Sequence, residues 1–107
     1  MPTDAIAILC TVPDQALADR LAQALVEDRL AACVNALPGV TSHYRWQGKV
    51  ERAAEVLLVI KTERARFDAV CEKVRALHPY AVPELIALPI GAGAPDYLAW
   101  LTENSAP

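Results

Sequence analysis

The sequence is poor in cysteine, in excess positive charge and in long apolar runs, and each shortage excludes a class of protein. Three cysteines in 107 residues are an odd and sparse set, which fits a reducing compartment and argues against a disulfide framework. Ten Lys and Arg against thirteen Asp and Glu give a formal net charge of −3, and no segment gathers the basic residues. Nucleic-acid binding therefore has no electrostatic basis. Apolar runs such as residues 5–12 are too short to span a bilayer.

Targeting signals and disorder are not indicated either. The opening residues, MPTDAI, lack the basic stretch followed by an apolar stretch that defines a signal peptide. With 54% hydrophobic and 21% charged residues, the chain is too apolar to be disordered. Its length suits a single domain, residues 1–107, with its own hydrophobic core. We therefore expect a folded cytoplasmic protein that binds neither membranes nor nucleic acid.

Motifs of common enzymes are also missing. The sequence contains no GxSxG, no P-loop, no GxGxxG and no CxxC. Small acylphosphatases place a glycine-rich phosphate loop after their first strand, but residues 11–14 of this chain read Thr-Val-Pro-Asp and contain no glycine. These absences favour a protein that is not an enzyme and that carries no organic cofactor.

What the sequence does contain is a clear alternation of strand and helix patterns. Asp14 is placed to cap the first helix, and Thr62 the second. Pro38 and Gly39 interrupt the second strand as a bulge, and residues 47–49 join the second and third strands into a long hairpin. The predicted strands cover residues 5–11, 31–46, 50–62 and 83–90, and the predicted helices cover residues 15–29, residues 64–77 and a segment from Pro95.

The order β-α-β-β-α-β, followed by a C-terminal helix, is that of an α+β ferredoxin-like split βαβ sandwich. Right-handed crossovers place the first two helices on one face of a four-stranded antiparallel sheet, with the strands in the order 4-1-3-2. The other face needs cover that one short helix cannot supply, so we expect further copies of the chain to cover it in a closed oligomer. The overhanging hairpin, with His43, Tyr44 and Trp46, is expected to meet a neighbouring copy.

Polar residues with chemical capability are expected to gather at one edge of this sheet. We take the first and third strands to run parallel, so that their ends meet the start of the fourth strand. The residues that this arrangement brings together are Cys10, Thr11, Lys61, Thr62, His78, Tyr80 and Glu84.

Three interpretations of this group remain open. A thiolate, an imidazole and a carboxylate suit zinc or copper. An anionic small ligand is the second interpretation, because Lys61 and the helix N-termini near Asp14 and Arg64 are expected to point to the same edge. In the third, the roles are structural: Lys61 and Glu84 form a surface ion pair, and His78 bonds a carbonyl at a helix end. The other two cysteines, Cys33 and Cys71, are expected to be small buried hydrophobic residues.

Seven segments together resemble the CutA family of divalent-cation tolerance proteins. The similarity runs from Ala5 to Trp100, in the same order and spacing as in the family. The segments are LCTVPD (9–14), LAACVN (30–35), PGVTSHYRW (38–46), IKT (60–62), HPY (78–80), PELI (83–86) and YLAWL (97–101).

This resemblance implies a cytoplasmic homotrimer, similar to the PII signalling proteins, that is associated with tolerance of copper and other divalent cations and has no established reaction. It implies Cys10 and His78 as metal ligands. Some family members carry His-His-Pro-Tyr, but this chain has Leu77 in place of the first histidine. Glu84, or a residue of a neighbouring subunit, then has to complete the set Cys10, His78 and Glu84. A PII-like module that binds a small ligand or a partner between subunits is the alternative.

Overall fold

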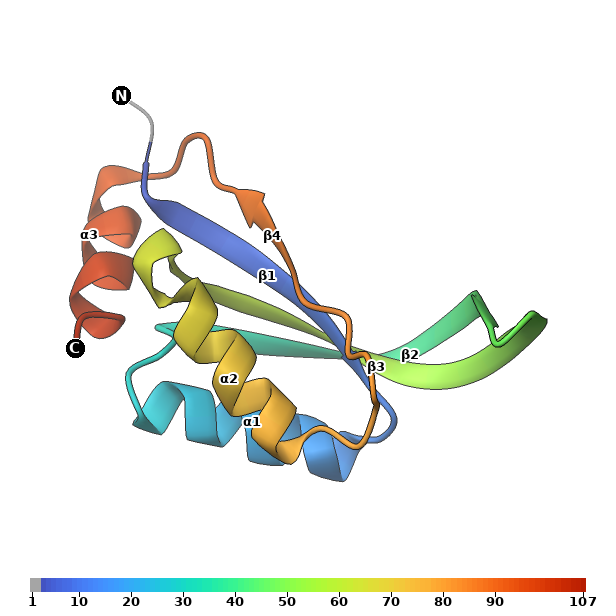
Figure 1. Ribbon diagram of the computed structural model, residues 1–107. Coiled ribbons are helices and arrows are strands. Elements are labelled where there is room, and N and C mark those ends of the chain that lie inside the picture. Colours follow the sequence, from blue (N-terminus) through green and yellow to red (C-terminus); the bar gives the residue numbers. More distant parts are fainter. Residues whose placement is uncertain (1–2) are drawn as a thin grey trace.

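The computed structural model describes residues 3–107 as four strands and three α-helices (Figure 1). Met1 and Pro2, which open the segment expected to lack a signal peptide, lie outside the described residues. Among the described residues, no helix is both long and apolar enough to cross a membrane. In chain order the elements are β1 (Ala5–Val12), α1 (Gln15–Glu27), β2 (Cys33–Trp46), β3 (Lys49–Glu63), a short 3-10 turn (Arg64–Arg66), α2 (Phe67–Leu77), β4 (Ile86–Pro89) and α3 (Pro95–Asn104). The predicted order of elements is confirmed.

Several predicted boundaries shift for local physical reasons. Helix α1 stops at Glu27 because Arg29 adopts a left-handed backbone with φ of 58°. Thr62 does not cap the second helix, since its hydroxyl donates a hydrogen bond to the Leu30 carbonyl at 2.7 Å. Strand β4 is shorter than predicted, and its pairing with β1 ends at Leu9. Beyond Leu9, the Thr11 carbonyl of β1 is hydrogen-bonded to the His78 ring, so it is not available to extend the pairing with β4.

The sheet has the predicted strand order, read as β2-β3-β1-β4, but every neighbouring pair is antiparallel. Ala5 pairs with Glu63 and Val12 with Val56, so β1 and β3 run in opposite directions. The expectation that these two strands are parallel is wrong. The crossover through α1 returns β2 in the direction of β1, and the hairpin that follows then reverses the chain, so β3 opposes both.

Helices α1 and α2 cover one face of this sheet. Strand side chains alternate between the two faces, and the set on the helix side of β1 is Ile6, Ile8, Cys10 and Val12. These side chains pack with Leu21 and Leu25 of α1 and with Val70 and Val74 of α2, all of them fully buried. The core of the protein therefore lies between the sheet and these two helices.

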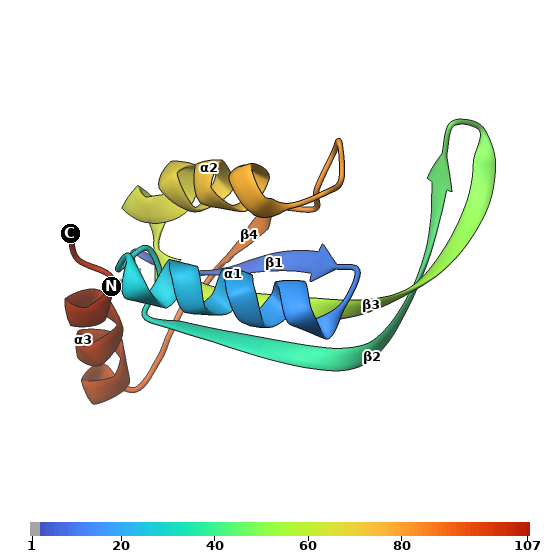
Figure 2. The same cartoon turned by 90° about the horizontal axis from the view of Figure 1, so that it is seen from below.

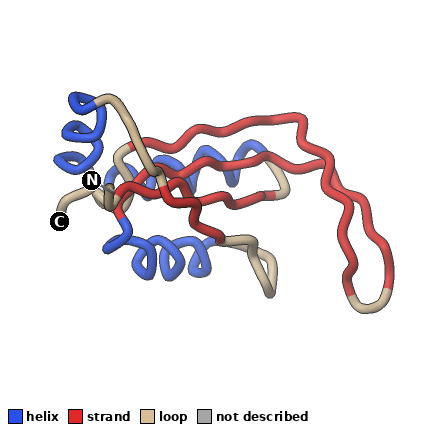
Figure 3. The backbone as a smooth tube through the Cα atoms, turned by 90° about the horizontal axis from the view of Figure 1, so that it is seen from above, coloured by secondary structure: helices blue, strands red, loops and turns tan. Residues whose placement is uncertain are grey.

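The opposite face of the sheet is largely uncovered. Helix α3 lies at the end of the sheet where β1 begins (Figure 3), and its buried Leu101 packs against Ala5 and Ala32. Leu37, Ile86 and Leu88 remain 44%, 52% and 49% exposed. We call the surface formed by these three residues with Leu9, Leu57 and Val59, their neighbours on the same side of the sheet, the open face.

The β2–β3 hairpin projects beyond the rest of the molecule and bends away from it (Figure 2). A register shift between Leu37 and Val40 confirms the predicted bulge, in which Gly39 takes a φ of 82°. The turn at the tip consists of Gln47 and Gly48, whose φ angles of 50° and 80° are those of a type I′ turn. The predicted overhanging hairpin is thus confirmed.

The first testable prediction concerns the start of α1. Asp14 caps this helix, because its Oδ1 accepts a hydrogen bond from the Leu17 amide at 2.8 Å. An Asp14→Ala variant should lose about 1 kcal/mol of unfolding free energy in urea denaturation, whereas Asp14→Asn should stay close to the wild type. Equal losses in the two variants would show that the side-chain cap is not the source of the effect.

Candidate functional site

The antiparallel pairing divides the predicted polar group between the two ends of the sheet. Cys10 and Thr11 lie at the end where β1 finishes, and Thr11 pairs with Leu57. Lys61 and Thr62 pair with Ala7 and Ile6, toward the other end of β1. Lys61 and Thr62 therefore do not belong to the site. The cause is the direction of β3, which was wrongly taken to be that of β1.

The two helix N-termini also lie at opposite ends. Helix α1 begins directly after β1 finishes, whereas the amide of Arg64, at the start of the second helical segment, donates to the Asp4 carbonyl just before β1. The expectation that two helix N-termini and Lys61 meet at one edge is therefore wrong. The interpretation of this group as an anion site depended on that expectation. Among residues 3–107, the ion pair that forms joins Lys73 Nζ to Asp28 Oδ2 at 2.7 Å, not Lys61 to Glu84.

His78 is buried at the C-terminal end of α2, and both of its ring nitrogens are engaged. Nε2 lies 2.8 Å from the Thr11 carbonyl oxygen, and Nδ1 accepts a hydrogen bond from the Tyr80 amide at 3.1 Å. A neutral ring with its proton on Nε2 satisfies both bonds. This geometry is that of the structural interpretation, in which His78 bonds a carbonyl at a helix end.

Cys10 is fully buried beside the same acceptor, with its Sγ 3.8 Å from the Thr11 carbonyl oxygen. Burial, followed by the negative charges of Glu84 and Glu55, raises the pKa of the Cys10 thiol from 9.0 to about 12. The thiol is therefore protonated at neutral pH. Cys33 and Cys71 are half-buried, so the expectation that both lie in the core is not met.

Glu55 is a site residue that the sequence reasoning missed. It lies on β3 opposite Val40, is only 7% exposed, and its Oε2 accepts a hydrogen bond from the Tyr80 hydroxyl at 2.8 Å. Burial and this bond to Glu55 raise the pKa of Tyr80 to about 12. The sequence did contain a signal for Glu55, which is the single acidic residue at the start of the apolar run EVLLVI. Such a residue indicates a polar partner elsewhere in the fold, because a strand interior seldom buries a carboxylate that has no partner.

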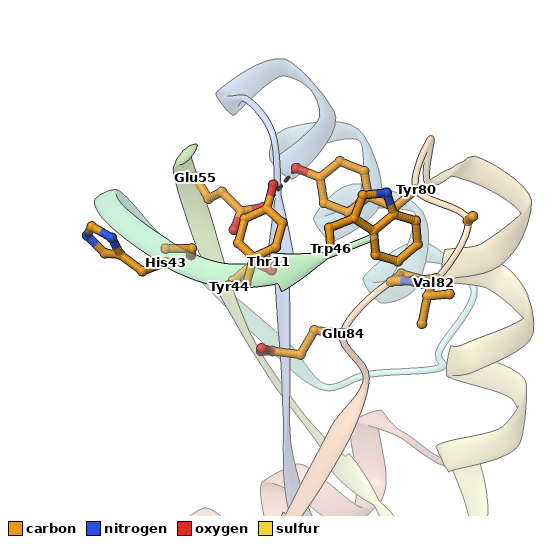
Figure 4. Close-up of a pocket in the computed structure, with 11 residues that line it drawn as sticks. Thr11, His43, Tyr44, Trp46, Glu55, Tyr80, Val82 and Glu84 are labelled. Atoms are coloured by element: carbon orange, nitrogen blue, oxygen red, sulfur yellow. Dashed lines mark hydrogen bonds between the residues drawn. The ribbon is translucent and has the colours of Figure 1, made fainter. Parts of the chain in front are cut away.

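Glu55 and Tyr80 border an open pocket of about 650 Å³ between the hairpin and the loop that joins α2 to β4 (Figure 4). We call it the hairpin pocket. In Figure 4, Glu55 and Tyr80 meet at their hydrogen bond near the ring of Tyr44, while His43 points away from that group. The side chains that give the pocket its chemical character are those of Thr11, Tyr44, Trp46, Glu55, Tyr80 and Glu84. Among residues 3–107, neither Lys nor Arg lines the pocket.

The fit of a metal ion depends on Cys10, His78 and Glu84. Their thiol, imidazole and carboxylate are a donor set that suits copper or zinc. Within residues 3–107, however, no group of three His, Cys, Asp or Glu side chains is arranged to hold an ion. Binding at this set requires Cys10 to lose its proton and His78 to give up one hydrogen bond. The set stays a prediction.

Comparison with known proteins gives one consistent result. Residues 6–104 match the family described as CutA1 divalent ion tolerance protein. The divalent-cation tolerance protein CutA of Thermus thermophilus is 55% identical over 98 residues, which cover 92% of this chain and 95% of that protein. The solved structure of a Thermus thermophilus divalent cation tolerance protein has a TM-score of 0.93 at 53% identity, covering 95% and 99% of the two chains. The structure of the periplasmic CutA from Archaeoglobus fulgidus has a TM-score of 0.92 at 37% identity, with the same coverage.

Proposed function

Because this chain belongs to the family of CutA1 divalent ion tolerance proteins, we propose that it is a cytoplasmic homotrimer that binds divalent cations, copper above all, without catalysing a reaction. Family membership supports the relation to divalent cations. The metal, the assembly and the compartment are proposals, and a relative from Archaeoglobus fulgidus is described as periplasmic.

The observation that carries the cation proposal is the acidic character of the hairpin pocket. Glu55 and Glu84 line it, and within the part of the chain that the structure describes no Lys or Arg side chain lies among its walls to neutralise them. Both carboxylates act on the Cys10 thiol, whose pKa they raise in addition to the effect of burial. This end of the sheet therefore attracts positive charge and disfavours anions.

Cys10, His78 and Glu84 are the ligands that we propose for the metal. A thiolate and an imidazole select soft or borderline ions, and copper above other first-row divalent metals. Cys10 and His78 share the Thr11 carbonyl as hydrogen-bond acceptor, so the two side chains are already neighbours. Leu77 cannot supply a further nitrogen, so we propose a residue of a neighbouring subunit as the source of a fourth ligand.

The second prediction tests this ligand set. Copper is titrated into the reduced wild-type protein and into a Cys10→Ser, His78→Ala double variant, with binding followed by calorimetry. The double variant should bind at least roughly 10- to 100-fold more weakly, the range that even the loss of an outer-shell partner produces. A Cys33→Ser, Cys71→Ser variant removes two thiols outside the site and should bind as the wild type does. Equal affinities of the wild type and the first variant would remove the proposed site.

The homotrimer proposal is supported by the open face. Leucine and isoleucine side chains that are about half exposed on one sheet face, as Leu37, Ile86 and Leu88 are, are unusual for a monomer, because large apolar patches mark contact surfaces. Tyr97 and Trp100 of α3, whose ring centroids are 5.5 Å apart, are each 42% exposed and are not core residues. Aromatic residues exposed in this way are typical of interfaces. The projecting hairpin supplies further surface for a neighbouring copy.

The alternative of a PII-like module that binds a small ligand or partner keeps one supporting observation, the hairpin pocket itself. Its volume of about 650 Å³ lies in the range of small-molecule sites. The anionic ligand first considered for such a module is disfavoured by the two carboxylates in its walls.

A further inference from the structure

We propose that the hairpin pocket binds an organic cation of the alkylammonium class. Membership of the divalent-cation tolerance family does not by itself imply that this pocket binds an ammonium ion. The inference shares Glu84 with the proposed metal ligand set, but Cys10 and His78 do not line the pocket, so the two proposals can be tested separately.

The pocket has an aromatic wall. Tyr44 and Trp46 are two positions apart on β2, so they share one face of the hairpin. Tyr80, from the loop after α2, completes the wall. The faces of aromatic rings carry negative potential, and they bind ammonium groups most strongly where water is excluded. Three rings that border one cavity are therefore suited to an alkylammonium ion.

The pocket also supplies fixed negative charge. The one hydrogen bond that the structure gives the Glu55 carboxylate, within residues 3–107, comes from Tyr80 to Oε2. That bond holds the side chain in place and leaves Oε1 free to face a ligand. Glu84 adds a second carboxylate to the residues that line the pocket. A buried acid is costly to maintain without a cation, so a positively charged occupant offsets the cost of burying Glu55.

The dimensions favour an organic cation over a bare metal ion or an anion. About 650 Å³ far exceeds the space that a single ion needs, and it matches the 300–1,000 Å³ typical of small-molecule sites. No group of three metal-ligating side chains occurs within residues 3–107, which include every wall of the pocket. An anion would face two carboxylates and, as far as residues 3–107 line the pocket, no Lys or Arg. The combination of rings and carboxylates is complementary to an alkylammonium ion.

The third prediction tests this inference with choline, a quaternary ammonium ion, and 3,3-dimethylbutan-1-ol, its neutral counterpart of the same shape. Each is titrated calorimetrically into the assembled protein in the presence of a chelator. Choline should bind and the neutral alcohol should not. Trp46→Leu and Glu84→Gln should each weaken choline binding roughly two- to thirty-fold, the range expected for one cation–π or charge contact. Trp46→Phe is the matched control, because it keeps an aromatic face at the same position and should lose less choline affinity than Trp46→Leu.

Three outcomes overturn the proposal: no heat of binding from choline, equal binding of the neutral alcohol, or equal losses of choline affinity in Trp46→Leu and Trp46→Phe. Sedimentation of each variant checks that the assembly is unchanged. Cys10→Ser separates this proposal from the metal proposal, because it removes a proposed copper ligand that does not line the pocket. Choline binding should survive in Cys10→Ser whether or not copper binding does, and its loss there would contradict an independent ammonium site.

Discussion

A Leu37→Glu variant should no longer form a trimer and should sediment as a single chain of 11.6 kDa. Leu37 lies on the open face opposite Leu57 and is 44% exposed in the isolated chain. If copies of the chain cover this face, a carboxylate at position 37 is buried in an apolar contact. The cost is on the order of several kcal/mol in each copy, enough to dissociate an assembly at micromolar concentration.

The control for this experiment lies on the other side of the molecule. Val26 of α1 is 43% exposed, almost the same as Leu37, but it belongs to the helical layer. Val26→Glu introduces the same charge at the same exposure and should leave the trimer intact. Light scattering at matched concentrations distinguishes the two variants. A wild-type protein that runs as a well-behaved single chain, or a Leu37→Glu variant that remains trimeric, would contradict the role proposed for the open face.

The wild-type protein should also lose stability steeply between pH 9 and pH 12. The pKa of Cys10 is about 12 in the folded protein and 9.0 in the unfolded chain. The stabilising contribution of this raised pKa is complete below pH 9 and disappears as the pH rises through 12, because the unfolded chain releases the proton first. A difference of three pKa units corresponds to a fall of about 4 kcal/mol in the free energy of unfolding. Tyr80, whose pKa is also raised, acts in the same direction.

Urea denaturation across this pH range at a fixed protein concentration measures the effect, since assembly makes stability depend on concentration. Cys10→Ala should flatten the alkaline slope by about one proton, or roughly 1.4 kcal/mol per pH unit. Leu58→Ala is the matched control, because Leu58 is the buried pairing partner of Cys10 and has no ionisable group. That variant should be less stable at every pH but should keep the slope. An unchanged slope in Cys10→Ala would mean that the thiol is not the source.

Much of the fold could be predicted from local patterns. The change from apolar runs to helical spacing separated the elements, and Asp14, Pro38-Gly39 and the Gly48 turn marked a helix start, a bulge and a hairpin tip that the structure confirms. These features depend on a few neighbouring residues, such as a side chain that caps its own helix or a glycine that tolerates positive φ. The strand order followed from the crossover rule, because the handedness of such connections is nearly invariant.

The candidate site could be predicted only in part. Placing Cys10 with His78 required just that the end of β1 and the end of α2 meet, which the fold class implies. Lys61 was misplaced by an error in one strand direction, because reversing a strand moves each of its residues to the other end of the sheet. Glu55 was overlooked because its partner, Tyr80, is 25 positions away in the sequence.

The sequence by itself determined the family, the order of elements and the apolar character of both sheet faces, since these properties depend on residue type and spacing. Only the tertiary structure decided the chemistry at the end of β1. There the fold buries the Cys10 thiol and raises its pKa, so that the thiol stays protonated at neutral pH. It also engages both ring nitrogens of His78 in hydrogen bonds and places Glu55 and Glu84 in one pocket with three aromatic rings. Charge, burial and hydrogen bonding depend on which atoms are neighbours in space, and in this protein those neighbours come from segments far apart in the chain.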